Sequence, residues 1–212
     1  DGEAVKRKMK GPADENLKLT VLRNQKRLTF NLLRTSVPVT PIDAAYMVSD
    51  TVGYIKIDKF ADRTYEAFMQ ALETLLKKGM KSLVIDLRGN GGGLLSEAVG
   101  IADELLAGIK LIVYTEGLHA PRVNYYSKRE GLFETGEITI LMDETSASAS
   151  EVLAGALQDW DRAKVVGRRS FGKGLVQQQF RLSNGAALRL TTAKYFTPLG
   201  RNIQRPYQNG KL

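Results

Sequence analysis

The stretch KSLVIDLRGNGGGLLSEAVGIADELLAG (81–108) places a strand, a glycine-rich loop and a helix in immediate succession. Its opening, KSLVIDL, is a nearly continuous apolar run, which is typical of a strand buried on both faces of a sheet. The glycines of RGNGGG allow a tight turn, and the apolar residues after them recur at helical spacing. A strand that leads directly into a helix is the repeating unit of α/β proteins, so this stretch predicts that fold class.

The same alternation continues on both sides of this stretch. Upstream, VGYIKID (52–58) predicts a strand and TYEAFMQALETLLKKG (64–79) predicts a helix ended by its final glycine. Downstream, the predicted order is strand, strand, helix and strand, over KLIVYTEG (110–117), EITILMD (137–143), ASEVLAGALQDW (149–160) and KVVGR (164–168). Strands alternating with helices predict a mostly parallel, buried sheet.

A short helix, two hairpins and a linker flank this core. DGEAVKRKMKGP (1–12) predicts the helix, and LKLTVLRNQKRLTFNLLRT (17–35) predicts a hairpin, because apolar and polar residues alternate on both sides of its NQ pair. VPVTPIDAAYMVSD (37–50) contains two prolines and predicts an extended linker. LVQQQFRLSNGAALRLTTAKYFTP (175–198) predicts a second hairpin, which turns at its SNG triplet.

Composition excludes several kinds of site. The 212 residues include no cysteine and one histidine, which rules out disulfides, cysteine nucleophiles and the usual zinc sites, so we expect no metal or cofactor. The net charge of +8 comes from basic residues spread along the chain without interleaved aromatics, and we expect a solvated surface and no nucleic-acid partner. No apolar run reaches the roughly 20 residues of a membrane span. The chain begins with Asp1, which suggests a processed or excised form.

Two glycine-containing loops invite comparison with phosphate sites. IDLRGNGGGLL (85–95) could cradle a phosphate or an oxyanion, or simply make a tight turn, but Leu94 occupies the third glycine position of the dinucleotide pattern. GRRSFGKG (167–174) resembles a Walker A loop, yet Gly174 replaces the Ser or Thr that would bind magnesium. A nucleotide site is therefore not expected, and Lys173 needs another role.

DETSASASE (143–151) begins the third predicted helix of the core with three serines. Ser148 and Glu151 fit a capping box, and Ser146 is an alternative N-cap, so the structural interpretation is strong. A serine at a helix start is also favourable for a nucleophile, because the backbone amides there can stabilise a negative oxygen.

A lysine is the available base for such a serine. A lysine acts as a base only when neutral, which means lowering a pKa near 10.4 by about three units, or roughly 4 kcal/mol. Lys173 stands between two glycines, with Phe171 and Leu175 beyond them. We predict that this apolar setting desolvates the lysine, with a solvated loop lysine as the alternative.

Four motifs together resemble the carboxyl-terminal processing peptidases, the tail-specific S41 type of serine protease. They are DLRGNGGGLL (86–95), TSASASEVLAGALQD (145–159), SFGKGLVQ (170–177) and LRLTTAKYFTPLGRNIQ (188–204). The resemblance covers about residues 37–207. It implies an S41 peptidase core over residues 37–212 with a crotonase/ClpP-like β-α fold. It also implies a C-terminal remnant of a PDZ domain over residues 1–36.

The resemblance also implies roles for individual residues. Ser148 would be the nucleophile, Lys173 its general base and Gln177 the residue that orients the lysine amine. The oxyanion hole would use the amide of Ala149 and that of a loop glycine, Gly92 or Gly93. The supporting residues would be Arg88, Glu151 and Asp159, whose structural alternatives are an ion pair, a helix cap and a helix-end residue. Ser146, Ser150 and His119 are expected to take no part in catalysis.

The implied function is an ATP-independent endopeptidase with a Ser-Lys dyad. It would cleave proteins near their C-terminus, with extended C-terminal segments as substrates, in a bacterial periplasm or cell envelope. A catalytically silent peptide-binding module is the alternative, because the PDZ portion is only partial. Loss of cleavage on mutation distinguishes these two possibilities.

Overall fold

The computed structural model describes residues 2–35 and 40–206. The chain divides into two compact units, Asp1–Val39 and Thr40–Leu212. The first residues of the predicted linker, 37–39, lie outside the described residues.

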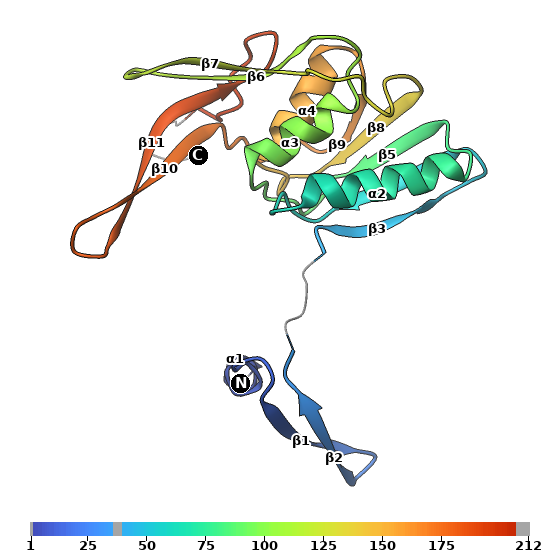
Figure 1. Cartoon of the computed structure of the whole chain (residues 1–212), viewed down its shortest axis with the longest axis vertical. Coiled ribbons are helices and arrows are strands. Elements are labelled where there is room, and N and C mark those ends of the chain that lie inside the picture. The colour runs from blue at the N-terminus through green and yellow to red at the C-terminus, as the bar shows by residue number, and fades with distance from the viewer. Residues whose placement is uncertain (1, 36–39, 207–212) are drawn as a thin grey trace. The chain divides into compact units, whose positions relative to one another are not determined.

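The first unit contains a helix and a hairpin, as the sequence predicts. They are α1 (Gly2–Met9), β1 (Asn16–Arg23) and β2 (Lys26–Leu33) (Figure 1). The two strands pair antiparallel, and the turn residues Asn24 and Gln25 have φ angles of 49° and 61°. Both angles are positive, as the tight hairpin turn requires. Within residues 2–35 no side chain is buried, so the described part of this unit has no core of its own.

The second unit is built on a five-stranded sheet. In spatial order its strands are β3 (Ile42–Met47), β4 (Val52–Ile57), β5 (Ser82–Asp86), β8 (Glu137–Met142) and β9 (Lys164–Gly167). β4, β5, β8 and β9 are parallel to one another, and only β3 is antiparallel to its neighbour. The α/β prediction is therefore confirmed, with a mixed sheet.

Three helices connect the parallel strands and close the core. They are α2 (Thr64–Lys77), α3 (Leu95–Asp103) and α4 (Ala149–Asp159). α2 buries Phe68, Leu72 and Leu75, which lie on one face at spacings of four and three residues. These side chains join Ile55 and Ile85 of the sheet in one hydrophobic cluster. The parallel strands thus hold their carboxyl ends in fixed positions, where the loops to α3 and α4 begin.

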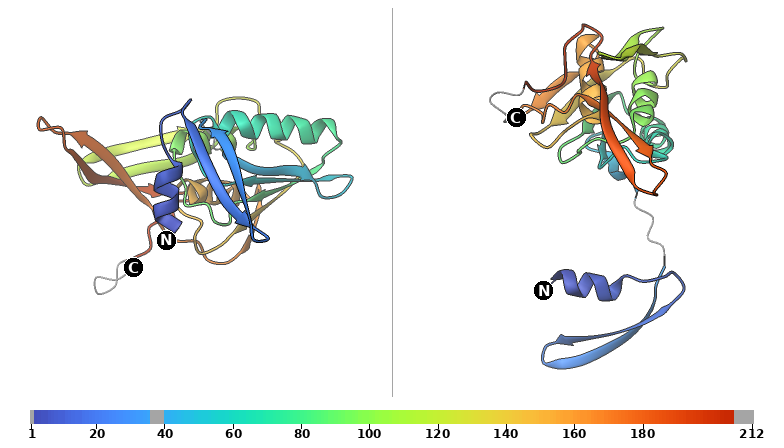
Figure 2. Two further views of the ribbon diagram at one scale, coloured as in Figure 1. Left: turned by 90° about the horizontal axis from the view of Figure 1, so that it is seen from below. Right: turned by 90° about the vertical axis from the view of Figure 1, so that its left-hand side faces the viewer.

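A second, four-stranded sheet is antiparallel throughout. Its spatial order is β10 (Leu175–Arg181), β11 (Ala187–Phe196), β6 (Leu111–Gly117) and β7 (Ala120–Tyr126). β10 and β11 are the predicted second hairpin, and they project from the body of the unit (Figures 1 and 2). The sequence pattern predicts no strand at β7, which is mostly exposed and contains Pro121, a residue that edge strands tolerate.

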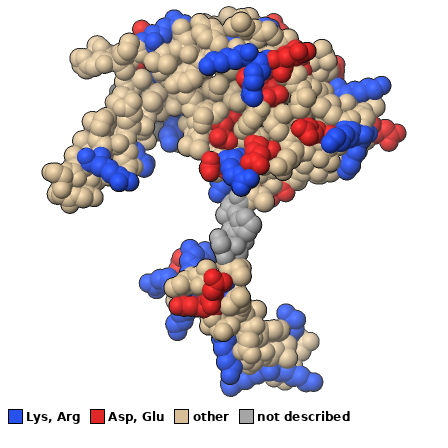
Figure 3. All heavy atoms as spheres, viewed as in Figure 1, with Lys and Arg blue, Asp and Glu red and all other residues tan. Residues whose placement is uncertain are grey.

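The linker prediction is wrong for residues 42–47, which form edge strand β3. Apolar and polar residues do not alternate regularly along β3, which is only partly buried. Its sequence pattern therefore did not distinguish it from an extended linker. Within the described ranges, no helix is long and apolar enough to cross a membrane. Basic side chains on the face in Figure 3 are interspersed with acidic ones, in keeping with the predicted solvated surface.

Candidate active site

Ser148 occupies a strained turn between β8 and α4. Its backbone has φ 57° and ψ −114°, a combination that costs free energy for any residue with a side chain. It is the N-cap of α4 and is half-buried, whereas its neighbours Ser146 and Ser150 are completely buried. Ser148 is therefore the one serine of SASAS whose side chain reaches solvent.

The other two serines tie this turn to the glycine loop after β5. The Ser146 hydroxyl donates to the carbonyl of Leu87 at 2.8 Å, and the Ser150 hydroxyl donates to the carbonyl of Asn90 at 3.0 Å. Both hydroxyls are thus committed to buried hydrogen bonds. Their predicted structural role is confirmed.

Asp143 adds a second tie between the same loops. Its carboxylate accepts hydrogen bonds from the backbone N–H of Gly89 at 3.1 Å and from the hydroxyl of Thr145 at 2.6 Å. Burial raises the pKa of this carboxyl, but the hydrogen bonds, led by that of Thr145, outweigh burial and lower the pKa to about 2. Asp143 is therefore ionised at neutral pH and holds the turn that precedes Ser148.

Asn90 joins the glycine loop to the serine turn from the other side. Its buried side-chain amide donates to the carbonyl of Ile57 at 2.9 Å, and its Oδ1 accepts the N–H of Gly92 at 2.8 Å. Its own carbonyl accepts the N–H of Ala147 at 3.0 Å. Asn90 was not among the predicted site residues, although a polar residue inside a glycine-rich loop was the available signal.

The two candidate oxyanion glycines differ in their surroundings. Gly92 has φ 95°, and a Cβ there would lie 2.8 Å from Ser148 Cβ and 2.9 Å from the Ala149 nitrogen. Gly93 has φ 149°, and a Cβ there would lie 2.0 Å from the carbonyl oxygen of Phe60. The Gly92 N–H is already bonded to Asn90, whereas those of Gly93 and Ala149 donate to no other described residue. The free amides in this region therefore include Ala149 and Gly93.

Glu151 connects the serine turn to the loop that carries Lys173. Its Oε2 accepts the backbone N–H of Ser148 at 2.8 Å and that of Lys173 at 2.9 Å. Its Oε1 accepts the hydroxyl of Ser170 at 2.7 Å and the N–H of Gly172 at 2.6 Å. The predicted helix cap is thus confirmed, and the same carboxylate also fixes segment 170–173. This buried side chain and the Phe171 N–H, which donates to the carbonyl of Ser146 at 3.0 Å, together hold the two loops in position.

We expect Glu151→Ala to destabilise the second unit by about 2–4 kcal/mol, because four donors lose their acceptor. Any peptidase activity should fall at least about 100-fold, since the serine turn and the lysine loop lose their common anchor. Urea unfolding and a cleavage assay measure the two effects. Glu144→Ala is the control, because Glu144 forms only an exposed pair with Arg168. Unchanged stability and cleavage in Glu151→Ala contradict this role.

The Lys173 side chain is exposed, so the predicted apolar enclosure is wrong for this structure. Phe171 is itself 44% exposed, and the flanking Gly172 and Gly174 have no side chains that could cover the lysine. The ammonium group makes no hydrogen bond or ion pair with the described part of the chain. Gln177 lies on β10 opposite Thr191 and is also exposed, and no hydrogen bond joins it to Lys173.

Arg88 forms an ion pair and does not reach the serine turn. Its guanidinium donates to the buried Asp86 at 2.7 Å, and the Tyr54 hydroxyl donates to the same carboxylate at 2.6 Å. Burial raises the pKa of Asp86, but these hydrogen bonds outweigh burial and lower it. Burial and the neighbouring carboxylate raise the pKa of Tyr54 to about 12. Arg88 therefore stabilises the end of β5, where the glycine loop starts.

Asp159 lies at the far end of α4 from Ser148, a helix of 11 residues and thus about 16 Å long. Its side chain is 2% exposed, pairs with Arg201 and accepts the N–H of Leu199 at 2.9 Å. Asp159 therefore anchors the segment after β11 and does not contact the serine turn.

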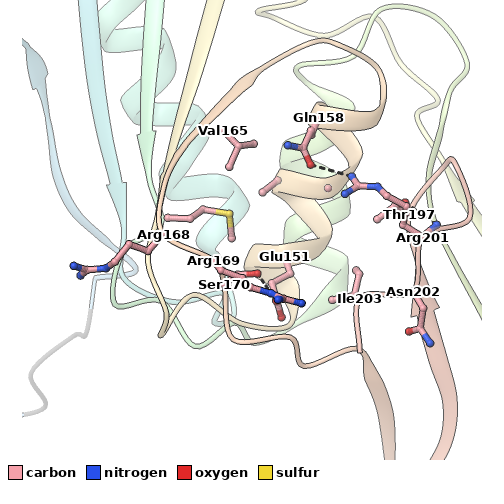
Figure 4. A pocket seen from close by; sticks show the side chains of 13 residues that line it. Glu151, Gln158, Val165, Arg168, Arg169, Ser170, Thr197, Arg201, Asn202 and Ile203 are labelled. Carbon is pink, nitrogen blue, oxygen red and sulfur yellow. Dashed lines mark hydrogen bonds between the residues drawn. The ribbon is translucent and has the colours of Figure 1, made fainter. Parts of the chain in front are cut away.

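A cavity of about 380 Å³ lies beside α4, on the side of Glu151 and Ser170 (Figure 4). Ile203 and Val165 supply apolar walls, and Arg201 crosses one end, where it donates to Gln158 at 3.0 Å. Neither Ser148 nor Lys173 lines this cavity, so it is distinct from the candidate active site. Among residues 2–35 and 40–206, no group of three His, Asp or Glu side chains is arranged to hold a metal ion.

Comparison with known proteins identifies the family. A model of peptidase family S41 matches residues 51–208. The carboxyl-terminal-processing protease of Synechocystis sp. is 36% identical over 209 residues, which are 93% of this chain and 47% of that protein. The carboxy-terminal-processing protease of Bartonella bacilliformis is 38% identical over 203 residues, covering 92% and 46%. The chain thus spans about half the length of these curated relatives.

Solved structures agree with this assignment. The photosystem II D1 C-terminal processing protease superposes with a TM-score of 0.72 at 30% sequence identity, over 96% of this chain and 56% of that one. A putative S41 protease from Bacteroides fragilis, at 13% identity, shares the fold with a TM-score of 0.67. The family resemblance stated from the sequence is confirmed, and the chain belongs to peptidase family S41.

Proposed function

We propose that this chain is the catalytic core of a serine endopeptidase in which Ser148 is the nucleophile and Lys173 its base. The observation that carries the proposal is the Glu151 carboxylate, which bonds the backbone of both residues and so holds their loops together. Family membership supports the reaction type. Ser148 is also the only serine of its motif that is open to a substrate.

The reaction divides into acylation and deacylation. The Ser148 hydroxyl oxygen attacks the peptide carbonyl while the neutral Lys173 amine takes the hydroxyl proton. The amides of Ala149 and Gly93 stabilise the negative oxygen of the tetrahedral intermediate, since the Gly92 amide is bonded to Asn90. The C–N bond then breaks, and Lys173 returns the proton to the leaving amine. Water, deprotonated by the same lysine, hydrolyses the ester.

Lys173 is exposed in the free chain, so the proposal requires the substrate to cover it. A polypeptide bound across the serine turn and the lysine loop would exclude water from the amine. Loss of water disfavours the charged ammonium form and leaves the neutral base that the first step needs. Gln177, two residues into β10, would then orient the amine.

The family points to substrates that are extended C-terminal segments of other proteins and to cleavage without ATP. We also propose that residues 1–36 are the remnant of a PDZ domain and that the peptidase core, residues 37–212, has a crotonase/ClpP-like fold. A periplasmic or cell-envelope location accords with the same resemblance. The exposed lysine favours one alternative, a catalytically silent peptide-binding module.

An unfolded test protein, incubated with this chain in EDTA and without nucleotide, tests the proposal. We expect discrete fragments that accumulate at a constant rate and are absent when the enzyme is omitted. The same assay with added ATP and magnesium should give the same rate. Cleavage that depends on ATP contradicts the proposal, and peptide binding with no cleavage at any pH between about 6 and 10 supports the silent module.

A further inference from the structure

Part of strand β11 has an open edge. On one side β11 pairs with β10 along its length, from Ala187 opposite Arg181 to Lys194 opposite Leu175. On its other side it pairs with β6 only over its last residues, Lys194 to Phe196. Toward their tips, the β10–β11 and β6–β7 hairpins separate (Figure 1). The β11 segment 187–191 therefore presents one edge that pairs with no strand of the described residues.

The backbone groups on this open edge can be assigned. The Leu182 N–H donates to the carbonyl of Ala186 at 2.8 Å and closes the hairpin. The carbonyl of Ala186 therefore faces β10. Because the backbone N–H and C=O groups of successive residues point to opposite sides of a strand, those of Ala187 and Arg189 point away from β10. Donors and acceptors on this edge are thus spaced to pair with another extended chain.

A cavity of about 720 Å³ adjoins the open edge. Thr191 and Ala193 of β11 form one wall, and Leu118 and His119 of the β6–β7 turn lie across from them. Beyond the paired residues, β6 still approaches β11 at Gly117, where a Cβ would lie 2.2 Å from the carbonyl oxygen of Thr192. The open edge therefore begins where this close approach ends, beside a space large enough for side chains.

We propose that the open edge of β11 binds an extended segment of the substrate polypeptide by strand addition, remote from the bond that is cut. The proposal rests on the proposed function. Unpaired edges recognise extended peptides through main-chain hydrogen bonds, with neighbouring cavities taking alternate side chains. A second copy of this chain is the competing occupant.

Continuity with the candidate active site favours the substrate. The loop that carries Lys173 leads directly into β10, and Arg189 lies opposite Gln179 of that strand. At about 3.3 Å per residue, Gln179 is roughly 20 Å along the strand from Lys173. About six residues of extended substrate would span this distance. Long peptides should therefore use the edge, and very short ones should not reach it.

Arg189→Pro tests the proposal, because proline removes the outward N–H and leaves the β10–β11 hydrogen bonds in place. Arg189→Ala is the matched control, since it removes the side chain and keeps the N–H. Two peptides that contain the same cleavable bond are compared. One has about twelve residues and is long enough to reach the edge, and the other has about four and is too short to reach it. We expect Arg189→Pro to raise KM for the long peptide about tenfold and to leave the short one unchanged.

Binding of the long peptide is measured in parallel by fluorescence anisotropy in a Ser148→Ala background, where cleavage plays no part. Arg189→Pro should weaken this binding to the same extent, so the edge is tested even if the chain proves catalytically silent. Unchanged affinity overturns the proposal. So does an equal loss for both peptides, or a wild-type dimer that Arg189→Pro converts to a monomer without changing KM.

Discussion

Ser148→Ala is expected to lower kcat for protein cleavage by about 10⁴-fold or more, with little change in stability. The reason is that Ser148 supplies the oxygen that forms the acyl-enzyme, and the other two serines of SASAS are buried. The measurement is the initial rate of cleavage of an unfolded protein, with circular dichroism to verify folding.

Ser150→Ala is the matched control for this prediction. It removes a buried hydroxyl from the first turn of the same helix, where that hydroxyl donates to the carbonyl of Asn90. Loss of the hydrogen bond should cost about 1–2 kcal/mol of stability and leave kcat within tenfold of the wild type. If Ser148→Ala cleaves as well as Ser150→Ala, Ser148 is a helix cap and nothing more.

Lys173→Ala should reduce kcat by about 10²–10⁴-fold, the usual contribution of a general base. Lys173→Arg should reduce kcat at least as much, because a guanidinium keeps its proton at any working pH. Wild-type kcat should rise with pH, because the neutral amine is the active form, and this rise should be absent from the residual activity of both variants. The measurement is kcat between about pH 6 and 10.

Lys164→Ala provides the comparison for lysine removal, since Lys164 is an exposed residue on strand β9. It should leave both kcat and the pH profile unchanged. A Lys173→Ala variant that retains the wild-type rise in kcat with pH places the base elsewhere and contradicts the dyad. If Lys173→Ala and Lys164→Ala lower kcat equally, the cause is instead a general effect of surface charge.

The sequence predicted those parts of the fold that depend on local pattern. The helices α2 and α4 and both hairpins follow from periodicity and turn residues, and the roles of Ser146 and Ser150 follow from their place beside a helix start. β3 and β7 escaped prediction because both are exposed edge strands. Their extended conformation depends on pairing with segments that are distant in the sequence, so the local sequence pattern is only a weak signal of a strand.

In the candidate site, too, the sequence predicted the local contacts and missed those between distant segments. The capping role of Glu151 was visible in the spacing of its motif, but its bonds to Ser170 and Lys173 cross about twenty residues and required the fold. The exposure of Lys173 was missed because flanking apolar residues do not ensure burial when glycines stand between them. Asn90 was missed because its partners come from two separate loops.

The most direct test of Ser148 as the nucleophile is to trap the acyl-enzyme. The chain is mixed with an activated peptide ester, quenched in acid within the first turnover, digested and analysed by mass spectrometry. We expect one acyl group, attached to the Ser148 oxygen and absent from Ser148→Ala. An acyl group on Ser146, on Ser150 or outside this motif, or sustained turnover without any acylated serine, would contradict it.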